Sequence, residues 1–373
     1  MNESTVVNMF LTIRVLIIGG VLLVIPHITR KGLLFGVYVG EDVVRGRSGR
    51  QIVQNWRRNC LLAMLLSLAI GFGISVAGAP VAGNLTGTAV LLIVVLILYL
   101  QVHSKAQGLV TPTAEGQAEI AVASLEIRSS TESGFAKLVL AICIVTGLVA
   151  VAYAVVAYFE MPSMVPPISD SGVMHEKSII TFIIVPLFNL VLSPFLALIA
   201  VLAVGAKRSL RGGAGGHSKK ALDAFRVAWT KLVSVVALLS CALWTLISVQ
   251  IVRIGLSEIH PIVAIVSVGV VAGVVVLVSA IGVIWLMKSY GQGGALRESG
   301  SVDERLTGSL ADNSHWLMGL FYYNADDPSM MIENRFGFGF SFNYGNRKAQ
   351  LIVATVLALL VGLSVLALIG RMT

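Results

Sequence analysis

The chain has 373 residues, of which 56% are hydrophobic and only 12% are charged, and its mean hydropathy is +0.88. Soluble domains usually carry about 25% charged residues, so this composition excludes an ordinary soluble protein and predicts that lipid covers most of the apolar surface. A net charge of +8 is typical of a membrane protein whose cytoplasmic loops are rich in lysine and arginine.

Eight apolar segments are long enough to cross a hydrocarbon layer about 30 Å thick. They cover residues 6–28, 60–76, 86–102, 135–158, 179–204, 227–251, 259–287 and 351–369. A segment surrounded by lipid must satisfy its own backbone hydrogen bonds, so each is expected to be a helix. The predicted fold class is an all-α polytopic membrane protein with eight transmembrane helices and a small cytoplasmic β-rich module before the last helix.

Lysine and arginine residues fall almost entirely on alternate connections between these segments. Of the 27 such residues, 23 lie in or beside one set of connections, and only Lys177, Arg253 and Arg371 lie on the other side; the remaining one, Arg14, lies within the first segment. The rich connections are 29–59, 104–134, 205–226 and 288–350. Because positive residues mark the cytoplasmic face, this split predicts a multi-pass protein with both termini outside.

The chain is expected to divide into four parts. Residues 1–288 form a seven-span membrane domain, and residues 289–315 form a polar cytoplasmic linker. Residues 316–348 form a small aromatic cytoplasmic module, and residues 349–373 form the eighth span and the C-terminus.

The fifth apolar segment contains Asn189 between Pro186 and Pro194. Proline removes a backbone donor and kinks a helix, so this segment is expected to be distorted. A broken helix with a polar group can form a substrate site in a transporter, whereas an asparagine at a helix interface is also a common packing contact. We favour the packing interpretation for Asn189.

The connection 159–178 is the longest on the expected outer side. Its candidate residues are Pro162, Pro166, Gly172 and Lys177. Proline restricts its own φ and the residue before it, so this connection should follow a fixed irregular path. We expect Lys177 to lie at the outer mouth of the fifth segment, within reach of Asp170 or Glu176.

The least membrane-like region is 316–344. Phe336, Phe338, Phe340 and Phe342 alternate with small or polar residues, which predicts an extended strand with four rings on one face. The stretch 324–328 has strong turn chemistry. The candidate residues of this module are Tyr322, Tyr323, Asn324, Asp327, Arg335, Gly337, Gly339 and Asn343.

No catalytic constellation is visible in the sequence. The zinc-protease pattern H-E-x-x-H and the nucleophile elbow G-x-S-x-G are both missing, and Cys60, Cys143 and Cys241 are too widely spaced for a metal site. We therefore expect no enzyme activity, no cofactor and no metal. The aromatic module lacks a basic groove, so direct nucleic-acid binding is not expected either.

Three separated stretches resemble a known family. Residues 25–31 with 35–37, and residues 162–166 with Gly172 and 177–178, resemble signatures of bacterial membrane proteins related to the SdpI-type toxin-immunity proteins. Residues 316–346 resemble a small C-terminal module of unknown function found on some of them. The resemblance implies a protein of the bacterial inner membrane that protects against a peptide toxin or holds a cytoplasmic regulator.

Three functions remain open on these observations. The first is immunity, stress protection or membrane signalling, with the lipid bilayer and an extracellular peptide or a cytoplasmic regulator as partners. The second is a transporter or permease subunit that uses the kinked fifth segment. The third is a membrane enzyme that acts on lipid-linked substrates.

Overall fold

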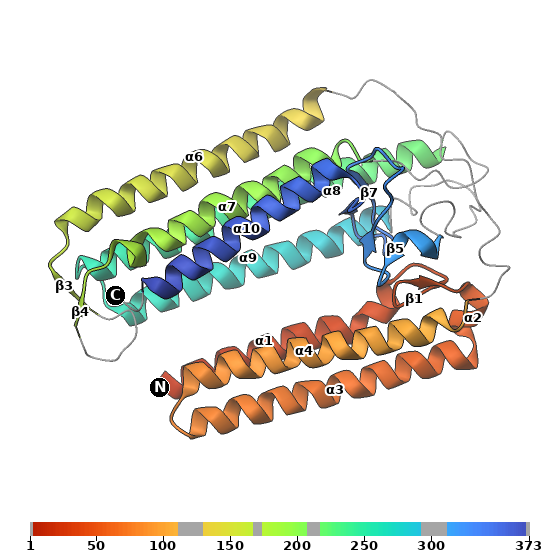
Figure 1. The fold of residues 1–373 in the computed structure, drawn as a ribbon, viewed down its shortest axis with the longest axis horizontal. Coiled ribbons are helices and arrows are strands. Elements are labelled where there is room, and N and C mark those ends of the chain that lie inside the picture. Colours follow the sequence, from red (N-terminus) through yellow and green to blue (C-terminus); the bar gives the residue numbers. More distant parts are fainter. Residues whose placement is uncertain (1–2, 111–129, 167–173, 207–216, 292–311, 371–373) are drawn as a thin grey trace.

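The computed structural model describes residues 3–110, 130–166, 174–206, 217–291 and 312–370, and most of these residues are helical. Consecutive long helices run in opposite directions (Figure 1). The helices are α1 (Glu3–Ile28), α2 (Glu41–Arg45), α3 (Arg47–Val76), α4 (Pro80–Gln107), α6 (Ser130–Glu160), α7 (Ile179–Ala203), α8 (His217–Gly255), α9 (Pro261–Tyr290) and α10 (Arg347–Ile369).

Each of the eight apolar segments corresponds to one of the long helices. Seven of the described helices, α3, α4 and α6 to α10, are long and apolar enough to cross a membrane, which confirms a helical protein of multi-pass character. The remaining one, α1, has 26 residues, and its apolar part is the shorter stretch Leu11–Pro26. The helix α7 continues through both of its prolines instead of ending at either.

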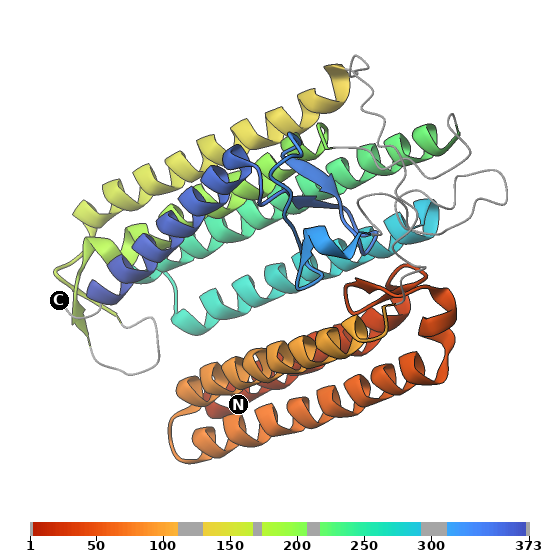
Figure 2. The same cartoon turned by 45° about the vertical axis from the view of Figure 1, so that its right-hand side comes forward.

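The helices pack in two groups (Figure 2). The helices α1, α3 and α4 form a three-helix group, and α6 to α10 form a five-helix group. Glycines allow close approach in the first group, since a Cβ at Gly87 of α4 would lie 2.9 Å from the carbonyl oxygen of Ser67 on α3. Small residues at such contacts are the usual basis of helix association in lipid, where no hydrophobic effect drives it.

Within the described residues, four short hairpins connect or flank the helices. The strands β1 (Leu33–Leu34) and β2 (Val37–Tyr38) follow α1, and β3 (Met164–Val165) pairs with β4 (His175–Glu176) between α6 and α7. The 3₁₀ turn η3 (Asn313–His315) precedes β5 (Trp316–Leu317) and β6 (Phe321–Tyr322), which are followed by β7 (Met331–Glu333) and β8 (Phe340–Phe342).

The segment 312–346, called the module below, contains β5 to β8 and lies at one end of the helices (Figures 1 and 2). The two antiparallel hairpins of the module meet through a single bridge between Tyr322 and Asn343. The β1–β2 hairpin lies at this same end, which we call the module end. The start of α1, the end of α10 and the β3–β4 hairpin lie at the opposite end (Figure 1).

The expected strand with four aligned phenylalanines is wrong. Only Phe340 and Phe342 belong to β8, because the chain turns at residues 335–339. The cause is the backbone of Gly337 and Gly339, whose φ angles of 83° and 132° lie in a region that favours glycine and does not occur in a strand. Phe336 packs with Trp316 and Tyr322, whereas Phe340 and Phe342 pack in another cluster.

Candidate functional site

The residues singled out in the sequence fall into three places. The module holds eight of them, from Tyr322 to Asn343, while Asn189 lies in the middle of α7. Pro162, Pro166 and Lys177 lie at the opposite end, around the β3–β4 hairpin. Gly172 and most of the expected linker 289–315 lie outside the described residues.

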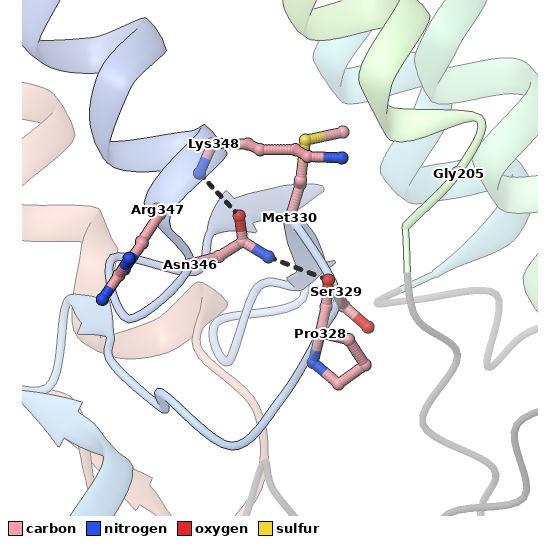
Figure 3. Close-up of a pocket in the computed structure, with 7 residues that line it drawn as sticks. All are labelled: Gly205, Pro328, Ser329, Met330, Asn346, Arg347 and Lys348. Atoms are coloured by element: carbon pink, nitrogen blue, oxygen red, sulfur yellow. Dashed lines mark hydrogen bonds between the residues drawn. The ribbon is translucent and has the colours of Figure 1, made fainter.

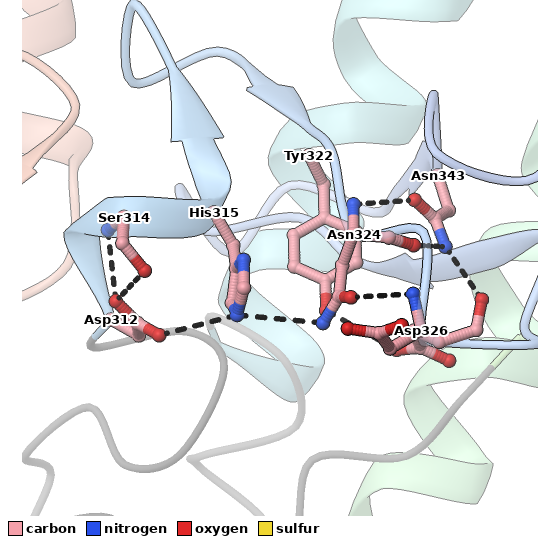
Figure 4. Close-up of polar contacts among 8 residues, drawn as sticks. Asp312, Ser314, His315, Tyr322, Asn324, Asp326 and Asn343 are labelled. Atoms are coloured by element: carbon pink, nitrogen blue, oxygen red, sulfur yellow. Dashed lines mark hydrogen bonds and ion pairs between the residues drawn. The ribbon is translucent and has the colours of Figure 1, made fainter.

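Asn343 organises the interior of the module. Its side-chain Nδ2 donates to the backbone carbonyls of Asn324, Asp327 and Ser329 at 2.9, 2.9 and 3.1 Å. Its Oδ1 accepts from the backbone N–H groups of Asn324 and Gly345 at 3.0 and 2.9 Å. Because Asn343 is fully buried, these five contacts satisfy backbone groups that would otherwise be desolvated without partners (Figure 4).

Tyr322 is the second buried anchor of the module. Its hydroxyl donates to Asp327 Oδ2 at 3.2 Å, and Asp327 Oδ1 accepts from the N–H of Ser329 at 3.0 Å. Burial raises the pKa of Tyr322 to about 12, and the negative charge of Asp327 acts in the same direction. The neighbouring Tyr323, by contrast, is exposed and lies outside the interior of the module.

Two buried charges of the module bind the loop that follows α1. Glu333 forms an ion pair with Arg30, and both side chains are almost completely buried. The guanidinium of Arg335 donates to the Gly36 carbonyl at 2.8 Å and to Asn313 Oδ1 at 2.7 Å. Burial lowers the pKa of Arg335 to about 9, which leaves this group protonated at neutral pH.

Asn313 completes the connection between the module and the β1–β2 hairpin. Its Oδ1 also accepts from the N–H of Tyr38 at 2.9 Å, and its Nδ2 donates to the Tyr38 carbonyl at 3.1 Å. The Asn313 amide therefore bonds to the backbone N–H and carbonyl of β2, in the way that a neighbouring strand would. We call the six residues that make these contacts the docking network: Arg30, Gly36, Tyr38, Asn313, Glu333 and Arg335.

An apolar cluster and a glycine contact surround the docking network. Leu33 and Tyr38 of the hairpin pack with Trp316, Tyr322 and Ile332 of the module. The turns of the β1–β2 and β5–β6 hairpins touch at two glycines, since a Cβ at Gly36 would lie 2.7 Å from the Cα of Gly319. Both glycines have positive φ angles, 80° and 70°, so neither position accepts another residue easily.

The other side of the module packs on the five-helix group. The indole N–H of Trp229 in α8 donates to the Phe338 carbonyl at 3.1 Å, and its ring meets Phe340 edge to face at 5.1 Å. Phe342 stacks on Phe195 of α7 with ring centroids 6.4 Å apart. The module therefore contacts both helix groups, and it connects them at the module end.

Asn189 is enclosed by protein groups. Its Nδ2 donates to Thr245 Oγ1 at 3.1 Å and lies 3.5 Å from the Cys241 carbonyl, while its Oδ1 accepts from Ser193 at 2.7 Å. These partners lie on α7 and α8, so the side chain joins two helices. Both ends of its amide are therefore engaged in contacts with α7 and α8.

Lys177 lies at the mouth of α7, but its partners differ from the expected carboxylates. Its ammonium donates to the backbone carbonyls of Tyr158 and Met161 at 3.1 and 2.7 Å and lies 4.8 Å from the centre of the Tyr158 ring. Lys177 thus ties the start of α7 to the end of α6. Asp170, one of the expected partners, lies outside the described residues.

A cavity of about 430 Å³ lies where the module meets the start of α10 (Figure 3). Asn346 caps this helix by accepting from the N–H groups of Lys348 and Ala349, and its Nδ2 donates to the Pro328 carbonyl at 2.8 Å. The side chain of Asn346 thus binds both the module, through Pro328, and the first turn of α10. The cavity lining is Gly205, Pro328, Ser329, Met330, Asn346, Arg347 and Lys348.

No group of three or more histidine, cysteine or carboxylate side chains that could hold a metal occurs among the described residues. The three cysteines are buried and free. The candidate site considered below is the docking network.

The sequence interpretation missed Arg30, Asn313 and Glu333 as functional candidates. Arg30 stands within the first-loop stretch that carried the family resemblance, and this was the only signal for it. Asn313 falls in the expected polar linker, and Glu333 falls between two aromatic stretches. Nothing in a single sequence indicates that these residues meet.

Comparison with known proteins gives a limited result. Residues 325–349 match a family of unknown function, DUF5808. This stretch contains β7, β8 and the start of α10, so it covers the part of the module that holds Glu333, Arg335 and Asn343. No curated protein and no solved structure matches the chain.

Proposed function

We propose that this chain is a non-enzymatic protein of a bacterial inner membrane that acts in protection against a peptide or in membrane signalling. In this proposal eight helices span the bilayer, both termini lie outside, and the module lies at the cytoplasmic face. The observation that carries it is the docking network, which holds the module on the loop after α1 with two buried charges, Glu333 and Arg335.

The proposed orientation rests on the charge distribution. The module end carries the connections rich in lysine and arginine, including the start of α3 and the end of α4. Reporter fusions after Gly172 and after Gly216 test it, because these positions flank the fifth span. Opposite sides are expected, and the same side for both fusions would contradict the eight-span arrangement.

Transport is less well supported than protection or signalling. A transport path at the fifth span would need free polar groups around Asn189, yet its amide is bonded to Ser193 and Thr245. The module, in turn, is packed between the helix groups in a way that lets a change in one group reach the other. This arrangement suits a protein that passes on a change at its outer loops.

The family resemblance also supports this proposal. The first-loop stretch and the module are two of the three stretches that carry it, and they are the two partners of the docking network. Their contact gives a physical reason for finding both in one chain, since each buries the other's polar groups.

The function is tested in cells that carry the intact chain, the variant Glu333→Gln, or the double variant Pro162→Ala with Pro166→Ala. Growth is measured against a panel of membrane-active peptides, with immunoblots of the membrane fraction as the control for protein level. The intact chain is expected to raise survival, and both variants are expected to lose this effect at unchanged level. Equal survival with and without the intact chain would contradict protection.

A further inference from the structure

The β5–β6 hairpin of the module has two unlike faces. Trp316 and Tyr322, which pair across the two strands, point inward and are 4% and 0% exposed. Leu317 and Phe321 form the next cross-strand pair on the outer face and are 53% and 43% exposed. Met318 in the turn is also 53% exposed. A hairpin in water would normally present polar side chains on its outer face.

The turn of this hairpin lies beside the apolar part of α4. The Met318 carbonyl lies 2.9 Å from the hydroxyl of Tyr99, which is in hydrogen-bonding position to it. Tyr99 is three residues before Val102, the last residue of the apolar run. At a helical rise of about 1.5 Å per residue, the Cα of Tyr99 lies roughly 4–5 Å below the apolar end of α4, and the turn lies beside the hydroxyl end of its side chain.

The backbone of the turn is closed by internal bonds. The Trp316 carbonyl accepts from the N–H of Gly319 at 3.1 Å, and the Leu317 carbonyl accepts from the N–H of Leu320 at 3.1 Å. With Tyr99 on the Met318 carbonyl, the three carbonyls from 316 to 318 all have protein partners. Irregular backbone at membrane depth requires this, because lipid offers no hydrogen bonds.

The polar groups of the hairpin are at its other end. Asp312 and His315 precede β5, and Asn324 and Asp326 follow β6, so they lie at the open base away from the turn (Figure 4). The hairpin is thus apolar at its tip and outer face and polar at its base. Tyrosine at the depth of Tyr99 is typical of a membrane interface.

We propose that the outer face of the β5–β6 hairpin, formed by Leu317, Met318 and Phe321, is a lipid-binding surface that inserts into the leaflet at the module end. Its ligand is the boundary of phospholipid headgroups and acyl chains beside α4. In this proposal the module lies in the interfacial layer of the membrane, between the two helix groups, and the docking network holds it there. Amphipathic elements bury their apolar faces to about 5–10 Å at this boundary.

The test uses the full chain in vesicles of phosphatidylcholine and phosphatidylglycerol. Leu317→Cys and Asp326→Cys are each labelled with an environment-sensitive fluorophore. Both positions are exposed, so neither replacement disturbs the core. The native cysteines are buried, and labelling of the unmodified chain measures their contribution.

The label at position 317 is expected to emit at shorter wavelength than the label at position 326. Lipids brominated near the headgroup should quench it about twofold more, and aqueous iodide should quench it less. Equal quenching of the two positions by iodide would overturn the proposal. The proposal would also be overturned if the label at position 317 is shielded from iodide but is not quenched by brominated lipid. In that case, energy transfer between labelled copies would identify a second copy of the chain as the occupant.

Discussion

Replacing Glu333 with glutamine removes the negative charge from its buried ion pair with Arg30, a residue that is 4% exposed. Breaking a buried pair in this way typically costs about 3–5 kcal/mol, because the remaining charge stays desolvated. Docking of the module on the β1–β2 hairpin should weaken by that amount. Each 1.4 kcal/mol or so changes the docking equilibrium constant about tenfold. The undocked population should therefore rise roughly a hundredfold to a few thousandfold.

The assay is the maleimide labelling rate of Leu33→Cys in a background without native cysteines. Leu33 is buried against Trp316, Tyr322 and Ile332, so a thiol at this position reacts only when the module leaves. Local opening of this kind sets the labelling rate when closing is fast. Glu333→Gln should accelerate labelling in proportion to the undocked population.

Two further variants make the experiment decisive. Glu41→Gln breaks the exposed ion pair with Arg45 and should change the rate little, because such pairs contribute under about 0.5 kcal/mol. The double variant Arg30→Met with Glu333→Leu removes both charges and should restore slow labelling, since apolar replacement of a whole buried pair is often neutral. Equal rates for Glu333→Gln and the parent would refute the reasoning.

Three other substitutions follow from the same contacts. Gly36→Ala should undock the module in the labelling assay, because its Cβ meets Gly319, whereas Gly40→Ala, with positive φ but open space around it, should leave docking intact. Asn343→Ala should cost about 3 kcal/mol by removing hydrogen bonds to three backbone carbonyls, one in a buried and two in part-buried contacts, seen as faster proteolysis between 312 and 346. An unchanged digest would contradict this. Phe342→Ala should lower the free energy of unfolding by about 3–5 kcal/mol and release the module from α7. Thermal unfolding in detergent measures this, and Tyr323→Ala, at an exposed position, is the control that should not change stability.

Hydropathy located every long helix, because each helix contains one continuous apolar stretch and such a stretch is visible within a short window of the sequence. It could not give the full length of α8, which begins at His217, since residues 217–226 include several charges and read as a connection. Both prolines of the fifth segment lie inside one helix, α7, so the predicted kink stays a prediction. The helix contacts α6, α8 and α10, and a sequence pattern does not show such contacts.

The module was predictable only in part. The turn at 324–328 follows from local chemistry, whereas Asn343 was a candidate through the family resemblance, and the structure places these residues together. The alternation of phenylalanine and small residues predicted a strand, but two glycines with positive φ turn the chain there. The docking network was not predictable, because Arg30 and Glu333 are 303 positions apart and a single sequence carries no record of their contact.

The distance between Arg30 and Glu333 along the chain also sets an order for biogenesis. The helices α1, α3 and α4 are sequence neighbours, so they can insert and pack soon after they leave the ribosome. Arg30 must then wait for its counter-charge until the ribosome has made more than 300 further residues. During that interval the first loop lacks the contact between Arg30 and Glu333 and the packing of Leu33 and Tyr38 on the module. A chain that ends before residue 312 therefore leaves Leu33 and Tyr38 without the module residues that cover them.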